Sequence, residues 1–212
     1  MSEKSKDFKV MIKEAGALLL ITLVAGLLLG FVYELTLKPR MKQQELAIQR
    51  ACAEVMPDAS KFNEIEYTLS SDLETSLAES GITIGTVYEA EDSAGSFAGY
   101  VLESTSSEGY GGDIVLYLGV DPTQDTPHLI GVSILSISET AGLGMRAEEV
   151  LVPQFADKSV NDFIYTKTGA VNDNEIDAIS GATITTKAVT NAVNGGLQAA
   201  TELYKNKVGG GV

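Results

Sequence analysis

The sequence contains no tryptophan, one cysteine (Cys52) and one histidine (His128) among its 212 residues. A single cysteine excludes an internal disulfide and a CxxC metal site, and a single histidine excludes a multi-histidine metal centre within one chain. A Ser-His-Asp triad is also disfavoured. Because His128 has no partner within its own segment, we interpret it as a surface loop residue. Aromatic residues make up only 7% of the chain, too few to favour stacking of single-stranded nucleic acid.

Positive charge is also scarce. The chain has 15 Lys and Arg against 29 Asp and Glu, a net charge of −14. This balance argues against nucleic-acid binding, which needs clustered positive charge at the phosphates. Residues 43–212 alone carry eight positive and 25 negative side chains, a net charge of −17. We therefore expect this part to project into water rather than lie on an anionic leaflet.

Charge is absent from one long apolar run, Ala15 to Tyr33. At 1.5 Å per residue a helix of this length crosses the core of a bilayer, about 30 Å thick. A cleavable signal peptide is the alternative, but the A-x-A signature is missing after the run. We predict an uncleaved membrane helix over 15–37, preceded by a short cytoplasmic segment at 1–14. Four lysines before the helix and three basic residues after it favour this orientation only slightly.

The remaining chain predicts a single α+β domain with an antiparallel sheet and flanking helices. We expect a connecting helix and an irregular segment over 38–83, the folded domain over 84–207 and a flexible tail at 208–212. The connecting helix over 42–56 is amphipathic, and Cys52 is expected to pack on or near its apolar face. The segment 57–83 is predicted to be irregular. Runs rich in β-branched residues predict strands at 85–90, 96–103, 113–120 and 129–137. Residues 144–152 are predicted helical, and 160–165 and 170–179 short extended or loop segments.

Helical periodicity returns over 185–207. Gly195 and Gly196 weaken this helix by about 1 kcal/mol each relative to Ala, which suggests that another element approaches closely there. Directly before the helix lies Asp177-Ala-Ile-Ser-Gly-Ala-Thr183. One interpretation is a helix N-cap, in which hydroxyls satisfy free amides. Another is an anion site, because a helix N-terminus can bind phosphate and Lys187 adds a cation nearby. The two interpretations are compatible.

Two further glycine-rich loops flank predicted strands. Ser138 to Arg146 includes Gly142 and Gly144, which allow a flat ligand to approach the backbone. Glu108 to Asp113 includes Tyr110, which can contact an aromatic ring. Each loop alone is explained equally well as a simple turn.

Taken together, the three loops resemble those of the G subunit of the Rnf-type ion-translocating ferredoxin:NAD oxidoreductase and, more distantly, the C subunit of the sodium-pumping NADH:quinone oxidoreductase. The family's flavinylation motif is matched by Asp177, Ser180, Gly181, Ala182 and Thr183. The resemblance implies that 84–207 is an FMN-binding domain and that Thr183, rather than Thr185 or Thr186, carries FMN through a phosphoester. The family's Ser-Glu-Thr-Pro-Gly-Leu-Gly loop matches 138–144 with Ala141 in place of Pro, and Gly-Tyr-x-Gly matches 109–112. The expected cofactor-binding residues are Tyr110, Gly111, Glu139, Thr140, Gly142, Leu143, Gly144, Thr185 and Lys187.

A threonine hydroxyl is a poor nucleophile without a base, and no histidine lies near this motif. The resemblance therefore implies a separate flavin transferase that takes FMN from FAD with a metal ion. Asp177 is then a recognition or loop-shaping residue, and no catalytic residue is expected in this chain. Asp173 and Glu175 lack the spacing of a calcium loop and are interpreted as a solvated acidic turn.

By resemblance the protein is a redox subunit of a cell-membrane complex, with its C-terminal domain on the extracytoplasmic side. It would relay electrons between iron–sulfur-bearing and flavin-bearing membrane subunits while the complex reduces NAD and moves Na⁺ or H⁺ outward. The chain itself has no NAD fingerprint and no cluster cysteines. Two alternatives remain at this point: a membrane-anchored extracytoplasmic flavin reductase, and an anchored binding or scaffold domain without a cofactor.

Overall fold

The structure is a computed structural model that describes residues 3–209. Its contacts divide the chain into two units, one ending at Leu46 and one beginning at Ala47. Helix α1 (Glu3–Val55) contains the whole predicted membrane segment and the predicted connecting helix. Its apolar stretch has a mean hydropathy of 2.5 and is long enough to cross a membrane. Residues 47–83, described above as a connecting segment, belong to the same compact unit as the sheet.

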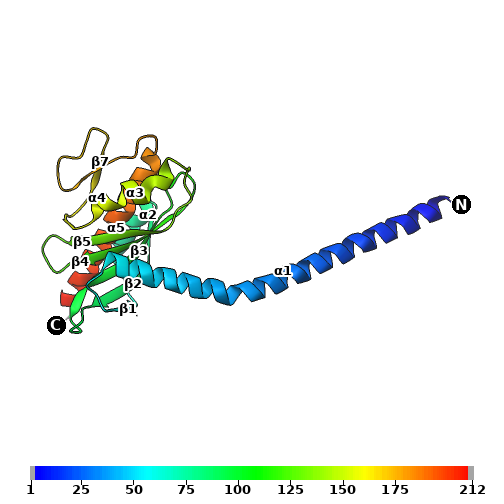
Figure 1. The fold of residues 1–212 in the computed structure, drawn as a ribbon, viewed down its shortest axis with the longest axis horizontal. Coiled ribbons are helices and arrows are strands. Elements are labelled where there is room, and N and C mark those ends of the chain that lie inside the picture. The colour runs from blue at the N-terminus through cyan, green and yellow to red at the C-terminus, as the bar shows by residue number, and fades with distance from the viewer. Residues whose placement is uncertain (1–2, 210–212) are drawn as a thin grey trace. The chain divides into compact units, whose positions relative to one another are not determined.

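The second unit is built on a six-stranded antiparallel sheet whose strands follow one another in chain order (Figure 1). The strands are β1 (Lys61–Ile65), β2 (Ile82–Glu91), β3 (Phe97–Ser106), β4 (Ile114–Asp121), β5 (His128–Ser136) and β6 (Lys158–Ser159). The four strands predicted from the sequence correspond to β2 to β5. This confirms the α+β class, with an antiparallel sheet and flanking helices.

The segment 57–83 is not irregular as predicted, because it forms β1 and helix α2 (Ser71–Glu79). The signal for α2 was present in the sequence: the Ser70 hydroxyl accepts the Leu73 amide at 3.4 Å, and Asp72 and Glu74 lie in the first turn. Such residues are typical of a helix N-terminus. The short β1 carries no comparable signal, since its pairing with Val87–Glu91 of β2 is a long-range contact.

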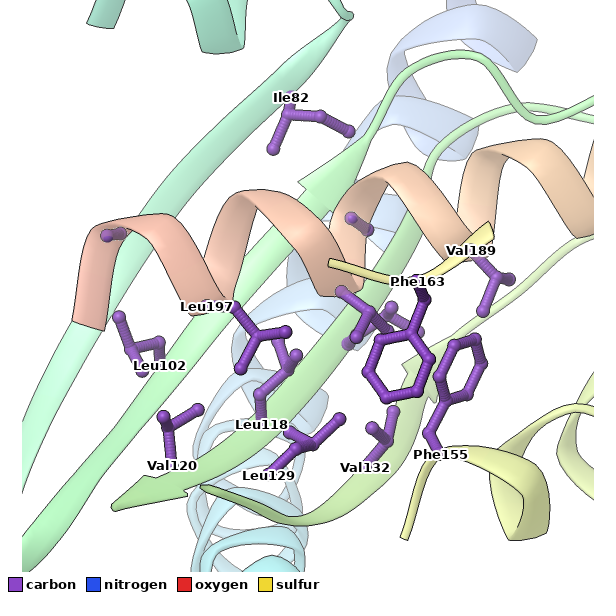
Figure 2. Packing of buried hydrophobic residues seen from close by; sticks show 14 of the residues in the cluster. Ile82, Leu102, Leu118, Val120, Leu129, Val132, Phe155, Phe163, Val189 and Leu197 are labelled. Carbon is purple, nitrogen blue, oxygen red and sulfur yellow. The ribbon is translucent and has the colours of Figure 1, made fainter. Parts of the chain in front are cut away.

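Helix α5 (Thr183–Gly209) packs on one face of the sheet against β2, β3 and β4. Leu197 lies over Leu118 and Leu102 in the apolar layer between them (Figure 2). A Cβ atom at Gly196 would lie 3.0 Å from Leu118 Cδ1, and one at Gly195 would lie 2.8 Å from Ile82 Cγ2. The predicted close approach at these two glycines is therefore confirmed, and it brings α5 close to the sheet.

The opposite face of the sheet packs against the last turns of α1. Cys52 and Val55 are buried there with Tyr117 of β4. A Cβ atom at Gly119 would lie 2.1 Å from the Val55 carbonyl oxygen, so only glycine allows this approach. Cys52 thus packs as a small apolar residue, as predicted.

The remaining elements lie at the end of the sheet where α5 begins. They are η1 (Gly144–Arg146), α3 (Ala147–Val150), α4 (Val152–Phe155) and the parallel pair β7 (Ile164–Thr166) and β8 (Glu175–Asp177). Phe155 and Phe163 join them to the core through an edge-to-face contact of 4.9 Å between ring centroids (Figure 2). In the predicted flexible tail, Val208 and Gly209 belong to α5, whereas 210–212 lie outside the described residues.

The sequence predicted that His128 is a surface loop residue. The structure instead places His128 as the first residue of β5, where it has two partners. Its Nε2 lies 3.2 Å from an Asp157 carboxylate oxygen, and its Nδ1 lies 3.0 Å from the Ser159 hydroxyl. Both partners come from the segment of β6, more than 25 residues away in the sequence. Only the pairing of β5 with β6 brings them together.

Candidate functional site

Three loops meet at the N-terminal end of α5 and enclose an open pocket of about 530 Å³. One loop joins β3 to β4, one leads from β5 into η1, and one leads from β8 into α5. Apart from Ile184, every lining residue was named in the sequence analysis. The lining residues are Tyr110, Glu139, Thr140, Leu143, Gly144, Gly181, Ala182, Thr183, Ile184 and Thr185.

The start of α5 is shaped by Gly181 and Thr186. Gly181 has a φ of +81°, a conformation that L side chains rarely adopt. The Thr186 hydroxyl accepts the Ile179 amide at 3.1 Å and donates to the Ala182 carbonyl at 2.9 Å. This buried side chain therefore ties the loop to the first turn of the helix, so that the loop arrives at Thr183 in a fixed conformation.

The threonines near the helix start differ in accessibility. Thr185, Thr186 and Thr190 are 1%, 0% and 2% exposed. Their hydroxyls donate to Glu139, to the Ala182 carbonyl and to the Thr186 carbonyl. Thr183 is half-buried, lines the pocket, and its hydroxyl has no hydrogen-bond partner within residues 3–209. It is the threonine of this group whose oxygen is free to react.

The first amides of α5 are free to bind an anion. The Thr186 amide donates to the Ala182 carbonyl, whereas the amides of Thr183, Ile184 and Thr185 have no acceptor in the part of the chain that the structure describes. Unpaired amides and the helix dipole give this end of the helix a partial positive charge. The site that the sequence predicted on the basis of a helix N-terminus therefore has the required donors.

Glu139 connects its own loop to the β3–β4 loop and to the first turn of α5. Its Oε1 accepts the Gly111 amide at 3.2 Å, and its Oε2 accepts the Thr185 hydroxyl at 3.0 Å. Gly144 lies against the same pair: a Cβ there would be 2.5 Å from Thr185 Oγ1 and 2.7 Å from Glu139 Cβ. A Cβ on Gly111 would be 1.9 Å from the Ser138 carbonyl oxygen. The glycines are thus required for close packing of the loops.

Several predicted site residues lie outside the pocket lining. The Lys187 ammonium pairs with a Glu108 carboxylate oxygen at 3.0 Å, and Gly142 has a φ of +77° in the turn before η1. Gly111 contacts the site only through the bond of its amide to Glu139. Ser180 is exposed in the turn before Gly181.

Two acidic side chains brace the segment that leads to Thr183. Asp177 accepts the Ala170 amide at 2.7 Å, and Glu175 accepts the Val171 amide at 2.8 Å. The bond from the Val171 amide, together with bonds from the side chain and backbone of Asn172, favours the ionised form of Glu175 and lowers its pKa from 4.5. Both carboxylates are therefore used in local hydrogen bonds to the loop between β7 and β8.

The rim of the pocket is apolar and exposed. Tyr110 is 72% exposed and Ile184 is 51% exposed, and Leu143, which also lines the pocket, is exposed as well. Ile184 escaped the sequence analysis because it lies between motif residues and reads as an ordinary helix position. Exposed apolar side chains gathered at one opening indicate a surface that contacts a ligand or partner.

These features fit a cofactor such as FMN. The volume lies within the range of about 300–1,000 Å³ typical of cofactor sites. Leu143 and Tyr110 give the pocket an apolar lining for a flat ring, and the free amides at the start of α5 suit a phosphate. One end of the pocket therefore favours an apolar ring and the other an anion.

Comparisons with known proteins give the family. The FMN-binding domain family matches residues 109–198, a range that contains all the pocket-lining residues. The G subunit of the Na⁺-translocating ferredoxin:NAD⁺ oxidoreductase complex of Acetobacterium woodii is 30% identical over 94% of this chain and 96% of its own length. The G subunit of the proton-translocating complex of Clostridium ljungdahlii is 31% identical over 96% of this chain and 99% of its own length.

A further relative and a solved structure are also similar to this chain. The G subunit of the ion-translocating oxidoreductase complex of Methanosarcina acetivorans is 30% identical over 89% of this chain and 93% of its own length. The crystal structure of NqrC from Shewanella oneidensis matches 58% of this chain and 61% of its own with a TM-score of 0.47 and 21% identity. Identity at this level across nearly the whole length of several relatives shows that the chain belongs to the G-subunit family of ion-translocating oxidoreductase complexes.

Proposed function

We propose that this chain is the electron-relay subunit of a membrane-bound ion-translocating ferredoxin:NAD oxidoreductase complex, and that it carries FMN through a phosphoester on Thr183. The family supports the redox role and the match to FMN-binding domains supports the cofactor. The observation that carries the proposed attachment is the position of Thr183. It is an accessible threonine at a helix N-terminus, at the edge of a pocket lined by glycine loops.

The accessibility of the hydroxyls favours Thr183 over its neighbours. Modification of Thr185 or Thr186 would break the hydrogen bonds to Glu139 or Ala182 and would require a phosphate in the packed core. An unpaired buried polar group costs about 1–3 kcal/mol. Modification of Thr183 breaks no hydrogen bond among the described residues. Attachment at this position therefore leaves the start of α5 intact.

The phosphate of the cofactor would lie against the first turn of α5. The free amides of Thr183, Ile184 and Thr185 can donate to its oxygens, and the helix dipole stabilises its charge. Lys187, the cation expected there, is engaged with Glu108 in this structure. We therefore assign the main electrostatic contribution to the helix terminus.

Attachment needs an enzyme outside this chain. His128 pairs with Asp157 and Ser159 and is not among the pocket-lining residues, so it does not serve Thr183 as a base. We propose a flavin transferase that uses FAD and a metal ion. The Thr183 oxygen bonds to the phosphorus of the FMN phosphate, AMP leaves, and a base of the transferase accepts the hydroxyl proton. Asp177, through its bond to the Ala170 amide, shapes the segment that the transferase contacts.

The pocket rim suits electron relay. FMN supplies a ring that takes up and releases one or two electrons. We propose that Glu139, Thr140, Leu143 and Gly144 line one side of the ring and that Tyr110 contacts it from the β3–β4 loop. The exposure of Tyr110 and Ile184 leaves the opening accessible to partner subunits. A covalent bond keeps the cofactor in place even in an open pocket.

The partners and the side of the membrane follow from the same proposal. We propose that the domain lies on the extracytoplasmic side, where a dissociated cofactor would be lost by dilution. There it would accept electrons from an iron–sulfur-bearing membrane subunit and pass them to a second flavin-bearing membrane subunit. The apolar part of α1 anchors the domain in the membrane. An anchored flavin reductase would share the pocket but would purify without such subunits.

The test is the intact mass of Thr183→Val and of wild type, each co-expressed with a flavin transferase. We expect wild type to gain one FMN-sized increment and Thr183→Val to gain none. Thr201→Val is the matched control, because Thr201 lies on the same helix and donates to the Leu197 carbonyl away from the pocket. It should be flavinylated like wild type. An increment retained by Thr183→Val, or lost by Thr201→Val, would contradict the assignment.

A further inference from the structure

We propose that Glu139 is a positioning residue that joins two of the loops to the first turn of α5 and so forms the pocket before any cofactor binds. The assembly of the loops is a property of the chain alone, whereas its effect on FMN binding rests on the proposed function. The sequence suggested Glu139 only as a residue that contacts the ring. In the structure both oxygens of its carboxylate are occupied by groups of the chain itself.

Glu139 accepts hydrogen bonds from a neighbouring loop and from α5. Gly111 lies 28 residues earlier in the β3–β4 loop, and Thr185 lies 46 residues later in the first turn of α5. Among the described residues, these are the only side-chain hydrogen bonds that join the segment 138–145 to the β3–β4 loop and to α5. Bonds to an ionised carboxylate are about twice as strong as those between neutral groups.

The surroundings of the Glu139 carboxylate leave it little freedom to move. A Cβ atom at Gly109 would lie 2.9 Å from Glu139 Oε1, and one at Gly144 would lie 2.9 Å from Glu139 Oε2. The two glycine backbones thus lie against the two oxygens. A side chain at either position would displace the carboxylate from the Gly111 amide and the Thr185 hydroxyl.

A second set of hydrogen bonds joins the β3–β4 loop to α5. Glu108 bonds Lys187 and Asn191 and holds the β3–β4 loop to α5 without involving the segment 138–145. Loss of Glu139 should therefore release one wall of the pocket while the fold remains. If the fraction of molecules with an assembled pocket falls to about a tenth, the apparent affinity for a ligand falls about tenfold.

The experiment measures amide hydrogen exchange of the full-length chain in detergent, prepared without a flavin transferase and without FMN. We expect Glu139→Ala to speed exchange at the Gly111 amide by about tenfold or more, as for loss of a hydrogen bond to a charged acceptor. Glu139→Gln keeps an acceptor oxygen for this amide and a group that can pair with the Thr185 hydroxyl. It should stay within about threefold of wild type.

Glu202→Ala is the matched control. The Glu202 carboxylate also accepts one amide and one hydroxyl, both from Ser70, but it joins α2 to α5 away from the pocket. This variant should leave exchange at Gly111 unchanged. The proposal is refuted if Glu139→Ala exchanges like wild type at Gly111, if Glu139→Gln exchanges like Glu139→Ala, or if Glu202→Ala accelerates exchange there as well.

A second arm adds FMN to the same preparations and measures its dissociation constant by fluorescence. We expect Glu139→Ala to bind about tenfold more weakly and Glu139→Gln to remain within about threefold. If wild type fails to bind FMN, the proposed cofactor is wrong, and the exchange arm still decides the role of Glu139. If exchange accelerates in Glu139→Ala while FMN affinity stays at the wild-type value, the loop link is real but does not position the cofactor site.

Discussion

Replacing Gly144 with alanine should disturb the pocket through one added methyl group. Its Cβ would lie 2.5 Å from Thr185 Oγ1, 2.7 Å from Glu139 Cβ and 2.9 Å from Glu139 Oε2. Real Cβ contacts are essentially never shorter than 3.0 Å, so all three atoms must shift. The two residues that must move are the two that share the hydrogen bond between the loop and α5.

The size of the effect follows from the cost of overpacking. An extra methylene in a well-packed site costs about 1–3 kcal/mol. If the loops relax by separating, this cost appears mainly in cofactor binding, where 1.4 kcal/mol is about a tenfold loss of affinity. If they stay together, it appears in the free energy of unfolding. A change of 1 kcal/mol then lowers the Tm by about 2–4 °C for a domain of this size.

The assay measures FMN binding by fluorescence and thermal unfolding by circular dichroism, both on the unflavinylated full-length chain. Gly142→Ala is the matched control in the same loop. A Cβ there contacts nothing within 4 Å, but its φ of +77° strains an alanine by about 1–2 kcal/mol. It should therefore lower stability with little effect on affinity. Wild-type affinity and wild-type Tm in Gly144→Ala would refute the steric argument, as would an equal loss of affinity in Gly142→Ala.

Two further predictions concern the start of α5 and the segment before it. Thr186→Val removes the hydrogen bonds to Ile179 and Ala182 in a fully buried site, so it should lower the free energy of unfolding by about 1–3 kcal/mol in chemical denaturation. Thr201→Val should not cause an equal loss. Glu175 has a folded-state pKa below its ordinary 4.5, so its stabilising effect is present above about pH 4.5 and is lost as pH falls through the folded-state value. Protection of the Val171 amide, measured as its exchange rate relative to that of an unstructured peptide at the same pH, should fall over that acidic range in wild type. Glu175→Gln should abolish this pH dependence of protection, and an identical pH profile in both proteins would contradict the prediction.

Local signals in the sequence were sufficient for much of the fold. The content of β-branched residues located β2 to β5, because such side chains favour strands, and helical periodicity located α5, because it reflects burial on one side of a helix. The motif around Thr183 pointed to a helix N-terminus for a similar reason, since glycine and hydroxyl residues satisfy its backbone. Short elements were missed. β1 exists through its pairing with β2, and α2 was overlooked despite its Ser70 cap.

By itself the sequence determined the apolar helix, the four strands β2 to β5, the three glycine loops and the family to which they are similar. These are properties of neighbouring residues, and a pattern along the chain records them directly. Only the tertiary structure decided how the loops meet, which threonine is accessible and what Glu139 contacts. Its partners Gly111 and Thr185 are 28 and 46 residues away, and only the folding of the sheet against α5 brings them within hydrogen-bonding distance.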